Sequence, residues 1–354
     1  MFMCLIVFTN NILDDYKLIF AANRDEFYDR PSEQADFWKE HPDLLAGKDL
    51  QAGGTWMGIT KQGRFAAITN FRDLKNYRTD APSRGNLTLD FLVNDFTPEE
   101  YYNKLKPSLN NFNGFNLIIG NVDKLYYFSN KTEGIQKLEP DIHGISNAIL
   151  DTPWPKVEKS KRQLKNLIEQ KNIHPWEILN LLDDTSLAKD EELPDTGVGL
   201  ELERMLSPIF IKSEKYGTRS STIVTVDKHN NVRFVEKTYF ANSGRFSNKD
   251  FNFIINNKLE VKMEEKVIQE KENQRFVIYA EGSEVYVEYM MGEKEINLYH
   301  TYTHPALRGK GLAAQVVRAA LEFAKENNLK VIPTCSYVQS FIAKNEEYKK
   351  LVAN

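Results

Sequence analysis

The sequence predicts an α+β protein made of two domains, and three observations support this. Its 354 residues suffice for two domains at roughly 100–200 residues each. Short alternating apolar runs give way near residue 155 to apolar residues at helical spacing, and they return after residue 220. A charged stretch over 257–274 then precedes a second, complete pattern of strands and helices. We therefore expect one domain over 1–258 and another over 259–354.

In the first domain, strands are expected on both sides of a helical region. Apolar runs bounded by polar turns predict strands within 4–10, 16–23, 57–71, 114–130, 221–227 and 232–240. Between them, Val157, Leu164 and Ile168 recur at helical spacing and predict an amphipathic helix over 155–172. The segment 176–184 continues as helix. Strands, then helices, then strands indicate a layered α+β arrangement.

The second domain shows the same change of period on a smaller scale. Strands are expected over 275–282, 284–292, 295–304 and 330–338, and helices over 311–327 and 340–352. Ala313, Val316 and Ala320 fall on one face of the first of these helices. Antiparallel strands followed by a helix, a strand and a helix indicate a small α/β domain.

Composition excludes several classes of function. The net charge is -4 and no Lys/Arg block stands out, which argues against a nucleic-acid partner. The longest apolar runs are far shorter than the ~20 residues that span a bilayer, and the start is a poor signal peptide. The two cysteines, Cys4 and Cys335, give no disulfide framework and no metal-ligand spacing. We expect a cytoplasmic protein that uses no metal, and the oligomeric state stays open.

The segment from Arg308 to Ala313 is the sharpest local pattern in the second domain. It follows a strand and opens a helix, with glycines at Gly309 and Gly311. Glycines let the backbone approach a ligand, and the first amides of a helix favour an anion. The alternative is a glycine-containing helix cap flanked by solvated cations. The spacing is not that of a P-loop.

Residues 275–354 resemble the GNAT-type N-acetyltransferases, and most closely their short, single-motif branch. Three segments carry the resemblance, in order: His300-Thr301, the Arg-x-x-Gly-x-Ala loop at Arg308, Gly311 and Ala313, and Pro333-Thr334-Cys335-Ser336-Tyr337-Val338. One departure is visible. Where the branch has His-Pro-Glu-Tyr, this chain has Asn345-Glu346-Glu347-Tyr348, so any role of that histidine is absent.

The resemblance implies acetyl-CoA as cosubstrate, a small-molecule amine as acceptor, and a thioester held between splayed strands. It places the CoA pyrophosphate on the loop Arg308, Gly309, Lys310, Gly311, Leu312 and Ala313. Cys335 and His300 are the catalytic candidates, because the amine must lose a proton and a thiolate must leave. Cys335 could accept the acetyl group, polarise the site, or be a buried strand residue. We expect direct transfer, since proximity alone can supply roughly 7–11 kcal/mol of the barrier.

In the first domain, short polar motifs stand at the expected strand ends. Residues 3–250 resemble the NRDE family, also called the Transport and Golgi organisation protein 2 family. The motifs are Cys4-Leu5-Ile6, Asn23-Arg24-Asp25-Glu26, Gly53-Gly54-Thr55-Trp56, Ser83-Arg84-Gly85, Ser146-Asn147, Pro153-Trp154-Pro155-Lys156, Leu193-Pro194-Asp195-Thr196-Gly197-Val198 and Tyr216-Gly217-Thr218-Arg219. Arginines and amides of this kind orient carboxylates and oxyanions.

The family resemblance implies a four-layer αββα sandwich of the N-terminal-nucleophile (Ntn) hydrolase type. By that analogy Cys4 is the nucleophile and its own α-amine the base, while Asp25 holds the amine. Asn147 forms the oxyanion hole, and Arg24 and Arg219 bind an acyl substrate. The alternative is a carrier that binds a lipid, acyl-CoA or haem without catalysis.

The first residues bear directly on that mechanism. The chain begins Met1-Phe2-Met3-Cys4, and removal of methionine requires a small second residue. A free Cys4 amine therefore requires translation from Met3. We expect the native chain to begin at Cys4. If Met1 is kept, Cys4 is an internal strand residue, and Arg24 with Asp25 forms a local ion pair.

Overall fold

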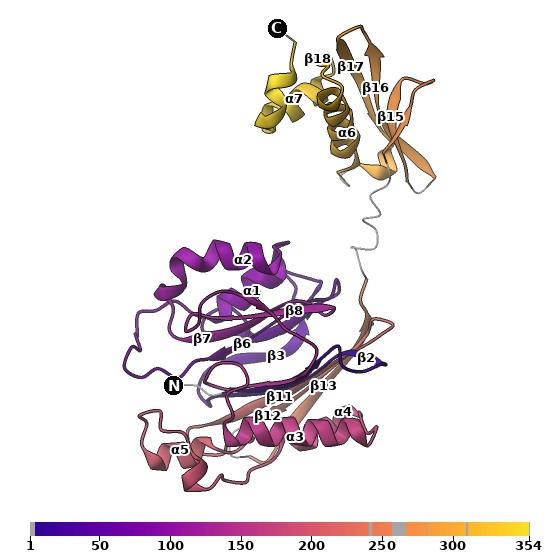
Figure 1. The fold of residues 1–354 in the computed structure, drawn as a ribbon. Coiled ribbons are helices and arrows are strands. Elements are labelled where there is room, and N and C mark those ends of the chain that lie inside the picture. Colours follow the sequence, from indigo (N-terminus) through magenta and orange to yellow (C-terminus); the bar gives the residue numbers. More distant parts are fainter. Residues whose placement is uncertain (1–3, 241–242, 257–266, 281, 309–310, 354) are drawn as a thin grey trace. The chain divides into compact units, whose positions relative to one another are not determined.

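The computed structural model describes residues 4–240, 243–256, 267–280, 282–308 and 311–353 (Figure 1). Contacts divide the chain into two compact units, Met1–Asn257 and Lys258–Asn354. The domain boundary expected between 258 and 259 lies outside the described residues. Within the described part of the chain, no helix is long and apolar enough to cross a membrane.

The first unit holds two antiparallel sheets. One has the order β10-β1-β2-β11-β12-β13, with bounds Ile142–Ile145, Cys4–Asn10, Tyr16–Phe27, Tyr216–Asp227, Asn231–Tyr239 and Phe246–Ile254. The other runs from β3 to β9 in chain order, with bounds Ser32–Phe37, Leu44–Asp49, Met57–Thr60, Arg64–Asn70, Phe115–Asn121, Lys124–Ser129 and Gln136–Lys137.

Helices cover the outer face of each sheet. Figure 1 shows α1 (Gly85–Val93) and α2 (Pro98–Leu105) on one side of the unit. On the other side lie α3 (Pro155–Glu169), α4 (Pro175–Leu182) and α5 (Leu200–Leu206). The four-layer αββα sandwich expected from the sequence is therefore confirmed.

Strand β1 shows why this sequence forms such layers. Ile6 and Phe8 enter the core between the two sheets, whereas Leu5 and Val7 pack under α3 and α4. Side chains alternate across a strand, so a strand covered on both faces reads as a continuous apolar run. This is the run seen in the sequence from Leu5 to Phe8. Because both faces are covered, only the ends of such strands can present polar groups to a cavity.

The second unit is a single sheet with helices packed on one face. Its order is β14-β15-β16-β17-β18, with bounds Ile268–Glu270, Arg275–Ala280, Ser283–Met291, Glu295–Thr303 and Lys330–Pro333. The apolar faces of α6 (Leu312–Glu326) and α7 (Ser336–Lys344) complete its core. Only β17 and β18 among these described strands pair in parallel.

Three sequence expectations about local structure were wrong. The helix expected over 340–352 is the second half of α7 (Ser336–Lys344) followed by a short 3-10 helix, Glu346–Leu351. The strand expected over 330–338 ends at Pro333, and Cys335 instead caps the start of α7. Proline cannot donate to a ladder, and pairing with β17 stops there. The segment Asn23–Glu26 does not follow the second strand; it lies inside β2, buried by the strands on either side.

Candidate functional site

Cys4 begins β1 beside the polar part of β2. Cys4 pairs with Arg24, the residue before Asp25. The Asp25 carboxyl group is 1% exposed, and its Oδ1 accepts a hydrogen bond of 2.6 Å from the Thr218 hydroxyl. Its Oδ2 has no hydrogen-bond partner among the described residues. A buried carboxylate oxygen without a partner is costly and points to a missing donor.

Burial is the largest cause of the shifted pKa values of Cys4 and Asp25. Loss of solvent, followed by the charge of Asp25, raises the pKa of the Cys4 thiol to about 12. Burial likewise raises the pKa of Asp25, although the Lys156 ammonium opposes this. A thiol in this environment is protonated at neutral pH and needs an adjacent base to act as a nucleophile.

Lys156 is a polar residue of this region to which the sequence assigned no role. It lies in the first turn of α3 and is 4% exposed, with its Nζ donating to the Leu206 carbonyl at 3.0 Å. Burial lowers its pKa, while the charge of Asp25 opposes that shift. Its place in the motif Pro153–Lys156 was the one sequence signal for it.

Asn147 lies close to Cys4 but is engaged elsewhere. Its side-chain amide donates to the Asn70 carbonyl at 2.6 Å, and its neighbour Ser146 donates to the Cys4 carbonyl at 3.0 Å. The cavity beside Cys4 has Asn70, and not Asn147, among its described lining residues. The Asn70 carbonyl thus takes up one of the two amide hydrogens of Asn147.

The cavity beside Cys4 has a volume of about 390 Å³ and is rich in arginine. Its charged lining residues are Arg24, Asp25, Glu26, Arg30, Asp49, Arg78 and Arg84. The Arg24 guanidinium lies 4.5 Å from the centre of the Trp56 ring, and 3.8 Å from Glu26. Arginines outnumber carboxylates here, so the cavity favours a substrate with an anionic or carbonyl oxygen.

Two glycine motifs meet at the wall of this cavity. A Cβ atom on Gly54 would lie 2.5 Å from the carbonyl carbon of Gly85. The Thr55 amide donates to the Gly85 carbonyl at 3.3 Å. This close approach places Trp56 and Arg84 at the same cavity, although they are 28 residues apart in the numbering. The sequence motifs marked both residues without showing that they meet.

Arg219 lies outside the Cys4 cavity. Its guanidinium donates to the carbonyl oxygens of Phe27 and Arg30 at 2.7 and 3.0 Å. It lines a neighbouring cavity of about 530 Å³, which shares Arg24 and Trp56 with the first. The two arginines assigned to substrate from the sequence thus both line this second cavity, and Arg24 alone also lines the Cys4 cavity.

In the second unit, β17 and β18 separate at the point where Cys335 follows. They pair from Glu295 to Leu298 only, after which β17 continues to Thr303. The Cys335 amide donates to the Leu298 carbonyl at 3.0 Å, and its Sγ lies 3.4 Å from the Thr301 hydroxyl oxygen. Burial raises the pKa of Cys335, but hydrogen bonds from Thr301 and the first amides of α7 outweigh it, so the pKa lies below its usual value.

His300 lies on the opposite face of the sheet from Cys335. Thr301 and Thr303 pair with the core residues Val287 and Val285, so Thr301 points toward the core side. Neighbouring residues of a strand point to opposite faces, which puts His300 on the side away from the helices. There it contacts Tyr286, at 6.3 Å between ring centres. The structure does not bring the two catalytic candidates of this unit together.

The expected pyrophosphate loop is described in part. Gly309 and Lys310 lie outside the described residues. Arg308 is exposed, and Gly311 caps α6 with a left-handed φ of 75° and open space where a Cβ would stand. Leu312 instead belongs to the core, with Ala313 packed against it. The first amides of α6 favour an anion, and Leu312 offers its backbone amide alone.

Comparisons with known proteins agree with this division. The family model described as Transport and Golgi organisation 2 matches residues 3–241, and the model described as GCN5-related N-acetyl-transferase matches residues 275–351. The Transport and Golgi organization 2 homolog of Mus musculus is 34% identical over 258 residues, covering 68% of this chain and 93% of that protein.

The second unit has its own relatives. Protein NATD1 of Danio rerio is 33% identical over 92 residues, covering 25% of this chain and 84% of that protein. Among solved structures, the Caenorhabditis elegans N-acylethanolamine-hydrolyzing acid amidase ortholog covers 62% of this chain and 91% of that chain at 11% identity. Its TM-score of 0.36 is too low to carry any argument. On the family match and the mouse relative, the chain belongs to the Transport and Golgi organisation 2 family and carries a GCN5-related N-acetyltransferase domain at residues 275–351.

Proposed function

We propose that the second unit transfers an acetyl group from acetyl-CoA to a small-molecule amine in the cytoplasm. The observation that supports this best is the separation of β17 from β18 at Leu298, with Cys335 beside the gap. A gap between strands can receive a thioester, and the open start of α6 after Gly311 can hold a pyrophosphate. The protein has two free cysteines, consistent with a reducing compartment.

In this proposal each described group has a separate task. The α6 amides and Arg308 bind the CoA phosphates, and the amine attacks the acetyl carbonyl as the carbon–sulfur bond breaks. The departing CoA thiolate takes up one proton, and the amine loses one. Cys335 lies next to the reacting thioester with a lowered pKa, so its thiol can supply or accept that proton. His300 stands on the other face of the sheet and is given no step in this proposal.

The two cysteines should differ sharply in reactivity. Iodoacetamide at pH 8 should modify Cys335 and leave Cys4 intact, because the thiolate is the reactive form. The pKa of Cys335 lies below its usual value, whereas burial raises that of Cys4 to about 12. Peptide mapping by mass spectrometry gives both extents, and acetyl-CoA should slow alkylation of Cys335 only. Equal modification of both residues would contradict this environment for Cys4.

Acetyl transfer itself should be measured as CoA release from the full chain with a panel of primary amines. Because transfer is expected to be direct, Cys335→Ala should keep most of the rate, and no acetylated protein should appear on intact-mass spectra. A covalent acetyl group that is missing from Cys335→Ala, and that passes to the amine at the turnover rate, would replace direct transfer by a two-step route. Absence of amine-dependent CoA release with any amine would leave the proposal without support.

A second candidate activity is hydrolysis of an amide or thioester at Cys4. The buried Asp25 with its unpartnered Oδ2 supports it, because a free α-amine at Cys4 would supply the missing donor. The Cys4 sulfur would attack the acyl carbon, its α-amine would take the thiol proton, and the leaving amine or thiol would depart with a proton. Water would then release the acid. A carrier role for this unit is the outcome if the native chain keeps Met1.

A further inference from the structure

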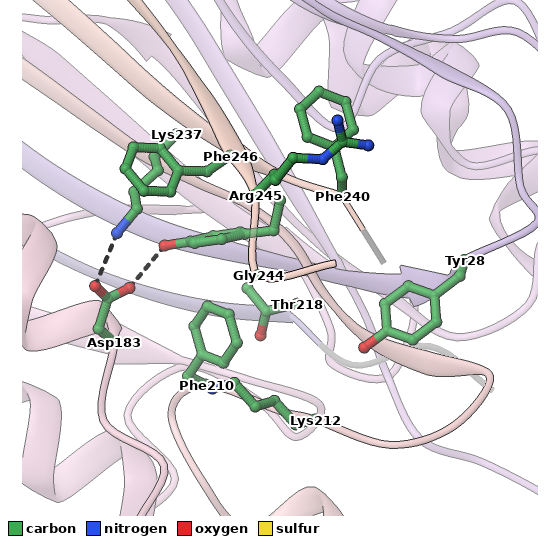
Figure 2. Close-up of a pocket in the computed structure, with 11 residues that line it drawn as sticks. Tyr28, Asp183, Phe210, Lys212, Thr218, Lys237, Phe240, Gly244, Arg245 and Phe246 are labelled. Carbon is green, nitrogen blue, oxygen red and sulfur yellow. Dashed lines mark hydrogen bonds and ion pairs between the residues drawn. The ribbon is translucent and has the colours of Figure 1, made fainter. Parts of the chain in front are cut away.

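A third cavity lies at the start of β11 and the end of β12, and it shares Tyr28, Tyr239 and Phe240 with the Arg219 cavity. Its volume is about 470 Å³, and its walls come from five places in the chain, one of them Tyr28 after β2. Figure 2 shows Asp183 after α4, Phe210 and Lys212 before β11, the end of β12, and the turn that carries Arg245 and Phe246. No role was assigned to any of these residues from the sequence.

The walls of this cavity are aromatic. The Phe210 and Tyr239 rings meet edge to face at 4.8 Å between centres. At the rim, Phe240 and Phe246 are 48% and 54% exposed. Large apolar rings cost free energy when water covers them, so rings that flank a cavity favour a ligand with an apolar body.

The charged side chains of the cavity leave a positive excess. Asp183 is already satisfied, since Lys237 lies 3.0 Å from one of its oxygens and the Tyr239 hydroxyl donates to the other at 2.6 Å (Figure 2). Two further cations, Lys212 and Arg245, line the cavity. Within the described ranges, neither forms an ion pair with a carboxylate. The site therefore carries two positive charges beyond the one that Asp183 balances.

A hydrogen-bonded wall separates this cavity from Cys4. The Thr218 hydroxyl lies in the wall, donating to Asp25 at 2.6 Å and accepting from the Ile211 amide at 2.9 Å. Ile211 stands between Phe210 and Lys212, which both line the cavity. A molecule in this cavity contacts Thr218, which donates to Asp25, and does not reach the Cys4 thiol. The site is thus separate from the proposed hydrolytic centre, and the proposal below does not depend on hydrolysis at Cys4.

We propose that this cavity binds a small amphipathic anion, with an aromatic or short aliphatic body among the rings and its anionic group attracted by the positive excess from Lys212 and Arg245, which lie on opposite sides of the cavity in Figure 2. The body replaces water on Phe240 and Phe246. The anionic group can bind to either cation, Lys212 with three donors or Arg245 with five. A neutral or cationic molecule of the same shape gains the apolar contacts and lacks the charge contacts.

The test uses the full chain and the fluorescent probe 8-anilinonaphthalene-1-sulfonate. The double variant Lys212→Glu/Arg245→Glu should weaken probe binding by at least about 10-fold, because attraction becomes repulsion at the anionic group. The matched control Arg162→Glu/Lys189→Glu reverses two cations at another cavity of the same unit, and should stay within about twofold of wild type. Thermal unfolding checks that both variants fold. If the double variant does not, Arg245→Gln replaces it, with a smaller loss expected.

Displacement defines the ligand class. Decanoate should displace the probe from wild type, and decanol and decylamine should do so at least about 10-fold less well. Equal displacement by all three would show an apolar site without charge selection and would overturn the proposal. Equal probe affinity in wild type, the double variant and the control would place the probe elsewhere and would overturn it as well.

Discussion

Replacing Gly311 by aspartate should weaken acetyl-CoA binding by about 100-fold or more. The residue caps α6 where the pyrophosphate is proposed to bind, and there is open space at its Cβ position. A carboxylate about 5 Å from a phosphate, at an effective dielectric constant near 20, costs roughly 3 kcal/mol per unit charge. Titration calorimetry with acetyl-CoA on the full chain gives the affinity directly.

Asparagine at the same position is the matched control. Gly311 has a left-handed φ of 75°, so any side chain there is strained. Asparagine and aspartate tolerate this conformation better than other residues and have nearly the same shape. Gly311→Asn should therefore stay within about 10-fold of wild type, and the difference between the two variants isolates the charge. Equal weakening in both would assign the loss to backbone strain and remove the pyrophosphate from this helix start.

Asp25→Asn should have opposite effects on stability in two forms of the chain. In a chain that keeps residues 1–3, burial raises the pKa of Asp25 to about 7 from the usual value near 3.8. The folded state then holds a proton that the unfolded state has lost, so this carboxyl group costs stability as pH rises from about 4 through 7. Asparagine removes that cost. The melting temperature at pH 8 should rise.

In a chain that begins at Cys4, the α-ammonium group is placed to pair with Asp25. Removing one partner of a buried ion pair costs about 3–5 kcal/mol, so Asp25→Asn should lower the melting temperature of the first unit. Asp29→Asn, at an exposed position four residues further along the chain, should change the melting temperature by the same amount in both forms. Sequencing of the native protein should find Cys4 first. The same sign of change in both forms would exclude an amine–carboxylate pair at this site.

The order of apolar and polar residues over short segments predicted individual strands and helices. The continuous apolar run Leu5–Phe8 and the helical spacing from Val157 to Leu164 each report burial directly, and β1 and α3 are confirmed. Strand β13 was not predicted, because its residues alternate between exposed and half-buried and its polar side chains dominate the composition. Burial of only one face leaves a weak signal in the sequence.

Sites were harder to predict than strands. The start of α6 at Leu312 followed from Gly311, whose freedom of φ is a local property. The burial of Lys156 could not be predicted from a local property in the same way. A lysine on an amphipathic helix is usually solvated, and only the approach of Leu206 from a distant segment buries it. The separation of His300 from Cys335 likewise depends on which face of the sheet the helices cover, and no motif records this.

The approach of Gly54 to Gly85 limits how this family of sequences can vary. The atoms that a Cβ on Gly54 would meet are backbone atoms of Gly85 and Asn86, which every amino acid carries. No substitution at either of those positions can therefore compensate for a change at Gly54. Natural selection can recover such a change only by moving the whole loop, and with it Arg84. Lineages that alter this glycine should be found with a reorganised or abandoned cavity beside the cysteine, and not with a paired replacement.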